Sequence, residues 1–382
     1  MARGPLDGIT VLDMSRVLAG PYCTMLLHDL GAHIIKIEPP AGGDDARGFG
    51  PFIGDKSAYF VSLNRGKQSI SLDLKDDNDR ETFESLLNKA DVLVENYRAG
   101  TLAKLGYAWE VLQQRWPTLI YAAISGFGHT GPYADRAAYD MVVQGMGGIM
   151  SITGHPGGEP TRVGSSIGDI NAALFAVAGI NAALYRRTHS GRGEFVDISM
   201  LDCQVAILEN AIARYEATGQ VPQPLGARHP SIAPFEAFRS ADSHLIVAAG
   251  NDKLFAAFAQ TIGREDLIVD ERFQSNASRC ENVSELKDQL ESALREYSTE
   301  HWLTELGAAG VPCGPINDVR AVLADPQIAA RNMVATIRDP EIGDLRVAGN
   351  PIKLASYVDT TERPTAPALD ADRQAILEFA ES

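Results

Sequence analysis

The sequence is poor in cysteine, and the few cysteines are widely spaced. Cys23, Cys203, Cys280 and Cys313 form no CxxC pair and have no histidine at metal-ligand spacing. A disulfide framework or a zinc site needs cysteines grouped at short intervals, so neither is indicated. We therefore expect four reduced thiols and no bound metal.

Long apolar runs and excess positive charge are also missing. No stretch approaches the roughly 18 apolar residues of a membrane span, and the start, MARGPLDGITVLD, lacks the apolar stretch of a signal peptide. The 34 Lys and Arg residues are outnumbered by 50 Asp and Glu residues, which gives a formal net charge of −16. Such a charge opposes nucleic-acid binding, because the phosphate backbone is repelled. We expect a cytoplasmic protein that binds neither nucleic acid nor a membrane.

What is present is a globular composition with a repeating strand and helix pattern. The 382 residues are 45% hydrophobic and 22% charged, which suits a chain long enough for two cores. Residues 8–15 alternate like a strand, residues 21–32 have helical spacing, and residues 33–38 return as a strand. This βαβ unit predicts two parallel strands joined by a right-handed crossover.

The same alternation continues along the first two hundred residues and then changes. Further strands are predicted at 69–74, 91–95, 119–125 and 194–200, with helical segments between most of them, the longest at 170–187. This pattern predicts an α/β fold: a Rossmann-like, doubly wound large domain over residues 1–224, completed by 326–382. Residues 201–219 resemble one helix. Beyond a Pro-rich connector, a mostly helical stretch predicts a smaller α+β domain over residues 225–325.

A glycine pattern invites a nucleotide-binding interpretation that its context does not support. Gly126, Gly128 and Gly131 spell GxGxxG after a predicted strand, but Pro132 follows at once and no clean helix start comes next. A dinucleotide fingerprint must open a helix in the first βαβ unit. Although Glu38 ends the second strand where a ribose-binding acid would lie, we do not expect nicotinamide chemistry.

Basic residues gather in the first third of the acidic chain. They are Arg16, Lys36, Arg65, Lys67, Lys75, Arg98 and Lys104. Most are expected to be solvated surface charges, because Lys and Arg are rarely buried. Several nevertheless fall at strand ends, where open α/β sheets bind ligands. This placement favours a substrate that carries phosphate.

Asp169 is the strongest candidate for covalent chemistry. No GxSxG elbow is present, and His129, His155 and His229 lie in Gly- and Pro-rich loops with no indicated partner. In the segment TRVGSSIGDI, Asp169 stands between a small-residue loop and an apolar helix. The simplest interpretation is a helix N-cap. Alternatively, the helix dipole favours the ionised carboxylate and the small residues before it leave room for a reacting carbon, as a nucleophile requires.

A set of longer motifs in a fixed order points to a known family. These are LDMSRVLAGPYCTMLLHDLGAHIIKIEPPAGGDDAR, NRGKQSISLDLK, DVLVENYRAGTLAKLG, LIYAAISGFGHTGPYADRAAYDMVVQGMGG, RVGSSIGDI, SGRGEFVDISMLD and GVPCGPIND. Nearly end to end, the chain resembles the family III CoA-transferases, the formyl-CoA transferase and carnitine CoA-transferase group. The resemblance implies a Rossmann-like large domain and an interlocked homodimer in which each chain threads through its partner.

The resemblance also implies a reaction. Asp169 would be the nucleophile, forming mixed-anhydride and β-aspartyl-CoA thioester intermediates. CoA would move from a short acyl-CoA, with acetyl-CoA first and formyl- or succinyl-CoA as further candidates, to a small carboxylic acid such as oxalate. Coenzyme A thioesters are then substrates, and no cofactor is expected. Backbone N–H groups of the loop GHPGG at 154–158 would stabilise the oxyanions, and Gly164 and Gly168 would give clearance for the thioester.

CoA contacts carry over position by position from the family. They are Arg16, Val17 and Leu18 after the first strand, then Leu72, Asp73, Leu74 and Lys75, then Asn96, Tyr97 and Arg98, then Lys104, and finally Tyr139 beside the thioester. Arg98 and Lys104 are the main expected phosphate contacts. The chain departs from the formyl-CoA enzyme at Leu18, where that enzyme has glutamine, and at Pro39, where it has arginine. A run of four glycines in the smaller domain is also missing between residues 225 and 253.

Two alternatives share the same fold. An α-methylacyl-CoA racemase moves a proton with a histidine and an aspartate, and that histidine would align with Tyr139. A phenol with a pKa near 10 is a poor proton carrier at neutral pH, which disfavours this alternative. A CoA-binding protein without turnover is the second, and the retained Asp169 argues against it.

Overall fold

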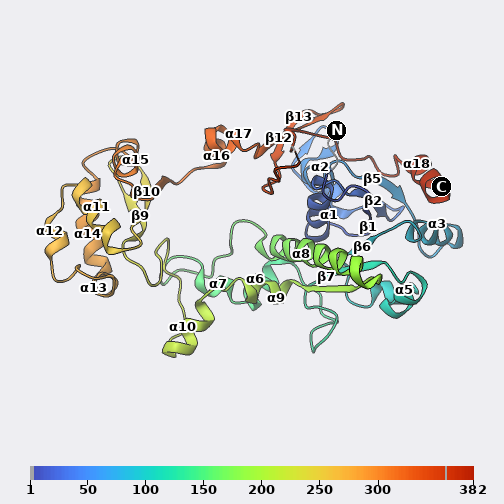
Figure 1. Cartoon of the computed structure of the whole chain (residues 1–382), viewed down its shortest axis with the longest axis horizontal. Helices are drawn as coiled ribbons and strands as arrows, with labels where there is room; N and C mark the ends of the chain where they lie inside the picture. The colour runs from blue at the N-terminus through green and yellow to red at the C-terminus, as the bar shows by residue number, and fades with distance from the viewer. Residues whose placement is uncertain (1–3, 358) are drawn as a thin grey trace. The chain divides into compact units, whose positions relative to one another are not determined.

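The computed structural model describes residues 4–357 and 359–382. The chain divides into two compact units (Figure 1). The large unit comprises Met1–Met150, Arg162–Gln220 and Asp325–Ser382, and the small unit comprises Ser151–Thr161 and Val221–Ala324.

A six-stranded parallel sheet forms the centre of the large unit. Its strands are β1 (Thr10–Asp13), β2 (His33–Glu38), β5 (Gln68–Ser71), β6 (Val92–Glu95), β7 (Ile120–Ser125) and β8 (Phe195–Ser199). Their spatial order is β5-β2-β1-β6-β7-β8, and every neighbouring pair is parallel. Counted along the chain this is the order 3-2-1-4-5-6, that of a Rossmann sheet. The predicted α/β class and all six predicted strands are confirmed.

Helices cover both faces of this sheet and enclose two cores. One face carries α1 (Ala19–Asp29), α8 (Ile167–Ser190) and α9 (Met200–Ala206), and the other carries α3 (Asp77–Leu87), α5 (Trp109–Arg115) and α18 (Arg373–Glu381). Successive side chains of a strand point to opposite faces, so Val11 lies in the first core and its neighbour Leu12 in the second.

Helix α8 corrects an expectation about apolar runs. Among the described residues, it alone is long and apolar enough to cross a membrane, judged by length and composition. The sequence pattern predicted no run that approaches roughly 18 apolar residues. Ala172, Ala176 and Ile180 are fully buried along one face of α8 and pack in the core against the sheet. The helix is therefore a core helix of the large unit.

Shorter elements complete the large unit. They are η1 (Asp45–Gly48), β3 (Phe52–Ile53), β4 (Lys56–Ser57), α2 (Ala58–Asn64), α4 (Thr101–Lys104), α6 (Asp140–Met146), α10 (Ala211–Thr218), α17 (Pro326–Ala330), β12 (Val334–Asp339), β13 (Gly343–Ala348) and β14 (Glu362–Arg363). Helix α7 (Ile149–Ile152) spans the point where the chain passes into the small unit. The single helix predicted at 201–219 is wrong: α9 and α10 are separate, because the backbone turns at Glu209, whose φ is 55°.

The small unit has its own sheet and its own core. Strands β9 (Phe235–Arg239), β10 (His244–Ala248) and β11 (Cys313–Pro315) pair antiparallel in the order β11-β10-β9. The helices are α11 (Asp252–Thr261), α12 (Asp266–Val269), α13 (Asn276–Glu281), α14 (Val283–Leu294), α15 (Thr299–Ala308) and α16 (Val319–Ala324). Phe238, Phe258 and Trp302 are among the buried side chains between them.

Candidate active site

Asp169 lies in the first turn of α8, two residues after the helix begins. The N-cap residue is Ser166, so Asp169 is not the cap that one interpretation of the sequence predicted. The pKa of the Asp169 carboxyl is shifted by burial and by the charge of Asp140. None of the residues that the structure describes donates a hydrogen bond to this carboxyl. A half-buried carboxylate without a hydrogen-bond donor is available to react with a bound molecule.

The ionisation of Asp169 is displaced towards neutral pH. Burial, and secondly the charge of Asp140, raise the pKa of Asp169 from 3.8 to about 7. The dipole of α8 acts in the opposite direction, but a helix N-terminus contributes only ~0.3–1 kcal/mol, less than one pKa unit. Burial therefore outweighs the dipole, contrary to the emphasis of the sequence interpretation. At neutral pH a substantial fraction of Asp169 is still ionised.

Asp140, at the start of α6, fixes the chain before Asp169. Its Oδ1 accepts a 2.8 Å hydrogen bond from the Gly168 N–H, and its Oδ2 accepts a 2.7 Å bond from Gln144 Nε2. Gln144 Oε1 in turn accepts a 2.9 Å bond from the Val163 N–H. Both ends of the segment 163–168 are therefore tied to α6. Sequence analysis missed this pair, although its i,i+4 spacing in YDMVVQ places both residues on one helix face.

Of the two glycines that were predicted to give clearance for a thioester, Gly168 has a different role. A Cβ at Gly168 would lie 2.7 Å from Val143 Cγ2 and 2.9 Å from Asp140 Oδ1. Gly168 is thus required for the close contact between α8 and α6, and the prediction that it gives clearance for a thioester is wrong. A Cβ at Gly164 would meet nothing within 4 Å, so that residue borders open space.

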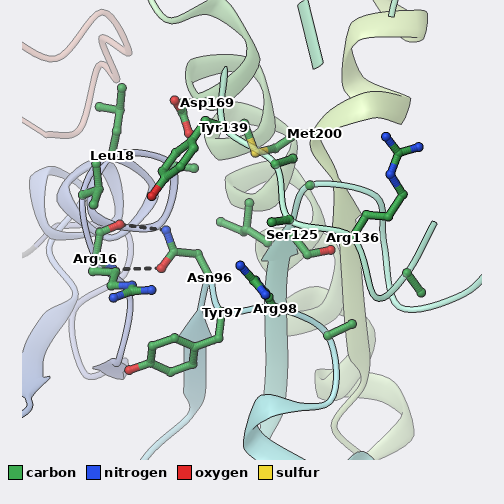
Figure 2. Close-up of a pocket in the computed structure, with 18 of the residues that line it drawn as sticks. Arg16, Leu18, Asn96, Tyr97, Arg98, Ser125, Arg136, Tyr139, Asp169 and Met200 are labelled. Atoms are coloured by element: carbon green, nitrogen blue, oxygen red, sulfur yellow. Dashed lines mark hydrogen bonds between the residues drawn. The ribbon is translucent and has the colours of Figure 1, made fainter. Parts of the chain in front are cut away.

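A cavity of about 180 Å³ opens beside Asp169 (Figure 2). The predicted site residues that line it are Arg16, Val17, Leu18, Asn96, Tyr97, Arg98, Tyr139 and Asp169. Three of these follow β1 and three follow β6, which are adjacent strands. Because the strand order reverses between β1 and β6, the cavity lies at the switch point where open α/β sheets bind ligands. Figure 2 shows Tyr139 next to Asp169.

Five further predicted residues do not line this cavity: Leu72, Asp73, Leu74, Lys75 and Lys104. The side chains of Leu72 and Leu74 are buried in the core beneath the sheet, so only their backbone could contact a ligand. Asp73 and Lys75 are exposed beyond β5, and Lys104 is exposed at the end of α4. Their contacts with CoA stay predictions.

Three arginines give the cavity its positive charge. The Arg16 guanidinium forms a 2.9 Å ion pair with Asp45 and lies over the Tyr97 ring. Arg98 follows Tyr97 on the wall of the cavity. Arg136 lies over the ring of Tyr133 at 4.6 Å, and sequence analysis missed it because nothing in YADRAAYD shows which way the loop folds.

Other basic residues that were expected at the surface are buried instead. Lys36, Arg65 and Lys67 are each less than 5% exposed. Lys36 pairs with Asp44 at 2.9 Å, Arg65 with Asp29 at 2.6 Å, and Lys67 with Asp13 at 2.8 Å. The expectation of solvated charge is wrong for these three, because a buried Lys or Arg is stable when an acid is paired with it.

Two more observations concern the surroundings of the cavity. No helix follows β7 directly, since α6 begins only at Asp140; the rejection of a dinucleotide fingerprint at Gly126 is therefore confirmed.

Tyr59 on α2 is a residue that sequence analysis missed. Burial, and secondly the charge of Asp169, raise the pKa of Tyr59 to about 12, so its hydroxyl stays protonated near the nucleophile.

Comparison with known proteins gives the family. A family model described as CoA-transferase family III matches residues 6–373. The chain belongs to this family. It is 47% identical over 380 residues to the acetyl-CoA:oxalate CoA-transferase of Acetobacter aceti, covering 99% of this chain and 96% of that protein. It is 37% identical over 361 residues to the succinyl-CoA:glutarate CoA-transferase of Homo sapiens, covering 94% and 82%. The protein is therefore a family III CoA-transferase, as the motifs predicted.

A solved structure of a similar protein has the same fold. The crystal structure of a CAIB/BAIF family protein from Brucella suis is 39% identical, with a TM-score of 0.86, and the match covers 99% of this chain and 100% of that one. Membership of family III thus rests on motif order, overall sequence and fold together.

Proposed function

We propose that Asp169 is the nucleophile of a CoA-transferase that moves CoA from a short acyl-CoA to a small carboxylic acid. The observation that carries the proposal is the position of Asp169: a carboxylate without a hydrogen-bond donor, in the first turn of α8, beside a cavity at the switch point of the sheet. With a pKa of about 7, a substantial fraction of Asp169 is ionised at neutral pH, and no positively charged side chain is among the causes of the shift.

The reaction divides one exchange between two acids into steps of similar difficulty. The Asp169 carboxylate attacks the thioester carbonyl, and departure of the CoA thiolate leaves a mixed anhydride. The thiolate then attacks the aspartyl carbonyl, which releases the donor acid and forms a β-aspartyl-CoA thioester. An incoming carboxylate attacks that thioester and expels the thiolate. The thiolate finally attacks the acyl carbon of the second anhydride, which gives the new acyl-CoA and restores Asp169.

The lining of the cavity suggests how CoA would lie. Arg16, Arg98 and Arg136 can neutralise its phosphates, since guanidinium groups bind phosphate oxygens in pairs. Leu18, Tyr139 and Met200 surround the end of the cavity near Asp169, where the thioester would be. Lys75 and Lys104 would contact parts of the nucleotide that extend beyond the cavity. The GHPGG loop at 154–158 belongs to the small unit, and its role as an oxyanion donor stays a prediction.

Acetyl-CoA and oxalate are the substrates we propose first, with formyl- and succinyl-CoA as further donors. Support comes from the relative that is 47% identical and carries the name acetyl-CoA:oxalate CoA-transferase. The human relative acts on succinyl-CoA and glutarate, as its name states. Selection between such acids depends on pocket shape, and one methylene changes binding by only ~1–3 kcal/mol. A matrix of acyl-CoA donors against carboxylate acceptors, scored by kcat/KM, would identify the preferred pair.

We also propose that the enzyme is a cytoplasmic homodimer. In support, the large unit exposes apolar side chains on three helices that a second chain could cover: Met141, Val142 and Met146 on α6, Leu174 and Phe175 on α8, and Ile212 and Tyr215 on α10. Analytical ultracentrifugation at several concentrations tests this: a dimer is expected throughout, and a stable monomer contradicts the proposal.

Trapping of the covalent intermediate tests the catalytic role. The enzyme is incubated with acyl-CoA and quenched with hydroxylamine, and the peptide that contains Asp169 is analysed by mass spectrometry. We expect an aspartyl hydroxamate at Asp169, which is lost with CoA transfer in D169A. D202N is the matched control, because Asp202 is also in the first turn of its helix but does not line the cavity. An unmodified Asp169, together with full turnover by D169A, would refute the nucleophile.

The racemase alternative makes a different prediction for the same protein. Exchange of the substrate α-hydrogen with deuterated water, without transfer of CoA to an added acid, would support it. We expect transfer without such exchange, because the racemase histidine would align with Tyr139, whose phenol is a poor proton carrier at neutral pH. A protein that only binds CoA would show neither reaction.

A further inference from the structure

The loop between β1 and α1 has an unusual backbone conformation at the cavity wall. Val17 has a φ of 67°, in the left-handed region that β-branched residues rarely adopt. Val17, Leu18 and Ala19 all line the cavity beside Asp169. Such a residue keeps this conformation only when its surroundings impose it. The groups that hold Val17 therefore determine the shape of this wall.

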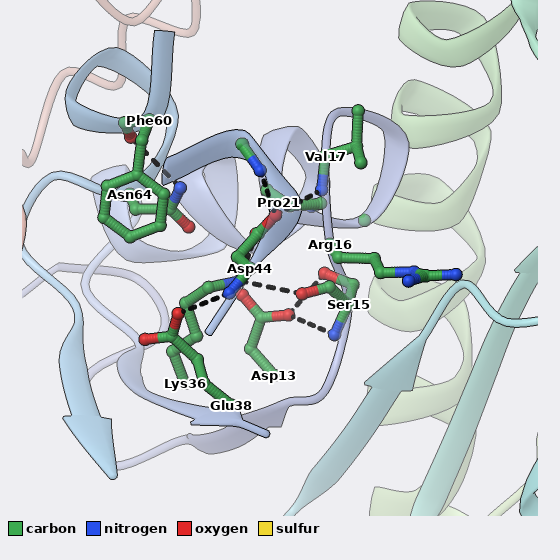
Figure 3. Close-up of polar contacts among 12 residues, drawn as sticks. Asp13, Ser15, Arg16, Val17, Pro21, Lys36, Glu38, Asp44, Phe60 and Asn64 are labelled. Atoms are coloured by element: carbon green, nitrogen blue, oxygen red, sulfur yellow. Dashed lines mark hydrogen bonds and ion pairs between the residues drawn. The ribbon is translucent and has the colours of Figure 1, made fainter. Parts of the chain in front are cut away.

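Side chains from three separate segments, at the end of β1, after β6 and before η1, bind the peptide groups of this loop. The Ser15 N–H donates to Asp13 Oδ1 at 2.9 Å, the Arg16 N–H donates to Asn96 Oδ1 at 2.8 Å, Asn96 Nδ2 donates to the Arg16 carbonyl at 2.7 Å, and the Val17 N–H donates to Asp44 Oδ1 at 3.0 Å. Figures 2 and 3 show these contacts. Every residue from Ser15 to Val17 is thus fixed by a side chain outside the loop.

Two buried charges connect the ends of this arrangement (Figure 3). Lys36 Nζ, on β2, lies 2.9 Å from Asp44 Oδ2 and donates a 2.7 Å hydrogen bond to the Ser15 carbonyl. The Asp44 N–H is itself held by Glu38 Oε2 at 2.9 Å. Neither Lys36 nor Asp44 lines the cavity beside Asp169. Separation of the two charges would leave each buried without its partner, which is costly, so the pair stays together. Because Lys36 holds the Ser15 carbonyl and Asp44 holds the Val17 N–H, the pair restricts the backbone at both residues to one geometry.

We propose that the buried Lys36–Asp44 pair is a positioning pair for acyl-CoA: it imposes the left-handed conformation on Val17 and so fixes the part of the cavity wall that Val17, Leu18 and Ala19 form. This role rests on the proposed function, since acyl-CoA is the ligand that the wall would contact. It also accounts for a lysine in the middle of a buried strand, which surface or phosphate-binding roles do not.

A double-mutant cycle tests the proposal. Glycine adopts positive φ as readily as negative φ, so V17G removes the strain that the pair has to overcome. The measured quantity is the Kd for acyl-CoA, by calorimetry, in four proteins: the unmodified chain, D44A, V17G and D44A/V17G. We expect D44A to raise the Kd about tenfold or more when Val17 is present, the effect of releasing a strained residue. When V17G is present, D44A should raise it by no more than about threefold.

A matched control separates positioning from general stability. Asp29 is another buried carboxylate of the large unit, paired with Arg65 at 2.6 Å and absent from the cavity wall. D29A should therefore change the Kd by the same factor with and without V17G. Equal effects of D44A in both backgrounds would overturn the positioning role, because loss of stability alone does not depend on residue 17.

Two further outcomes are distinguishable. If D44A does not fold, D44N serves in the same cycle, because asparagine keeps the shape of the side chain and one acceptor for the Val17 N–H. The expected increase in the Kd for acyl-CoA is then smaller, and V17G should abolish it. Absence of that coupling with D44N overturns the proposal. If the unmodified chain neither binds acyl-CoA nor transfers CoA, the proposed function fails and the positioning role fails with it. If it transfers CoA normally while the cycle shows no coupling, only the positioning role fails.

Discussion

Asp140 is hydrogen-bonded to Gly168, the residue immediately before Asp169. Its Oδ1 accepts a 2.8 Å hydrogen bond from the Gly168 N–H, and its negative charge helps to raise the pKa of Asp169. One residue therefore both positions the proposed nucleophile and opposes its ionisation. A neutral amide at position 140 removes the charge and keeps an acceptor oxygen for the Gly168 N–H, but it loses the bond that Asp140 Oδ2 accepts from Gln144.

The pH dependence of CoA transfer should report the ionisation of Asp169. Attack requires the carboxylate, and its pKa of about 7 predicts that kcat/KM falls as the pH falls below 7. In D140N the like charge is gone, so the acid limb should move to lower pH. The movement should be partial, because burial is the larger cause of the raised pKa. The check is the pH profile of kcat/KM for both proteins, with D202N as a control that keeps the profile. An unmoved limb in D140N contradicts the coupling.

Addition of one methyl group at Gly168 should destabilise the large unit. The new Cβ would lie 2.7 Å from Val143 Cγ2, and overpacking of this kind costs about 1–3 kcal/mol. We expect G168A to lower the Tm, measured by calorimetry. The double variant G168A/V143A should recover part of the loss, because it makes room for the methyl group. G164A is the control, since its Cβ would meet nothing within 4 Å and no decrease is expected. A Tm for G168A equal to that of the unmodified chain would contradict close packing there.

The central sheet was predictable because its signal is local. A buried parallel strand is a short apolar run, and HIIKIE matches the observed β2 from His33 to Glu38. The alternation of such runs with helical segments then restricts the topology to a parallel α/β sheet. The same local reasoning fails for Lys36, which the strand pattern carries into the interior. Its partner Asp44 lies in a loop that only tertiary structure brings close.

The site was predictable only in part, because its chemistry depends on contacts between distant segments. From its own surroundings in sequence, Asp169 is indistinguishable from a helix cap; the family motifs singled it out. Asp140 escaped notice because its partner, the Gly168 N–H, is 28 residues away in sequence. Gly168 was assigned to ligand clearance, since a sequence does not reveal that Val143 fills the space beside it.

Glu95 should make the stability of the large unit depend on pH. It is fully buried at the end of β6, where its carboxylate accepts hydrogen bonds from the Tyr97 N–H and the Tyr121 hydroxyl. Burial outweighs these bonds, and the nearby charge of Asp197 adds to it, so the pKa of Glu95 rises from 4.5 to about 7. The folded state then binds more protons than the unfolded state between pH 4.5 and 7. Stability from this group is present at low pH and is lost as the pH rises through 7.

The matching experiment compares Glu95 with glutamine, which imitates the protonated acid. A shift of this size corresponds to a loss on the order of 3 kcal/mol between pH 4.5 and 8. In E95Q this contribution should disappear, so its Tm should exceed that of the unmodified chain at pH 8 but not at pH 5. E110Q, at an exposed position on α5, is the control that keeps the original dependence. The same difference between E95Q and the unmodified chain at both pH values would contradict the raised pKa.

Arg136 should contribute to acyl-CoA binding, although it was not among the predicted contacts. Arg136 is one of the residues that line the cavity, and its guanidinium lies over the Tyr133 ring at 4.6 Å, which holds the positive charge in one place beside the cavity. A charge-assisted hydrogen bond contributes about 1.5–3 kcal/mol, so R136A should raise the KM for acyl-CoA about tenfold or more, with most of the loss in KM and not in kcat. R136K should recover little, because lysine lacks the planar fork and the ring contact. R186A is the control, since Arg186 pairs with Glu194 away from the cavity. The increase in KM caused by R136A should become smaller with added salt, because salt screens the phosphate charge. Equal KM values for R136A and R186A would exclude a contact between Arg136 and the phosphate.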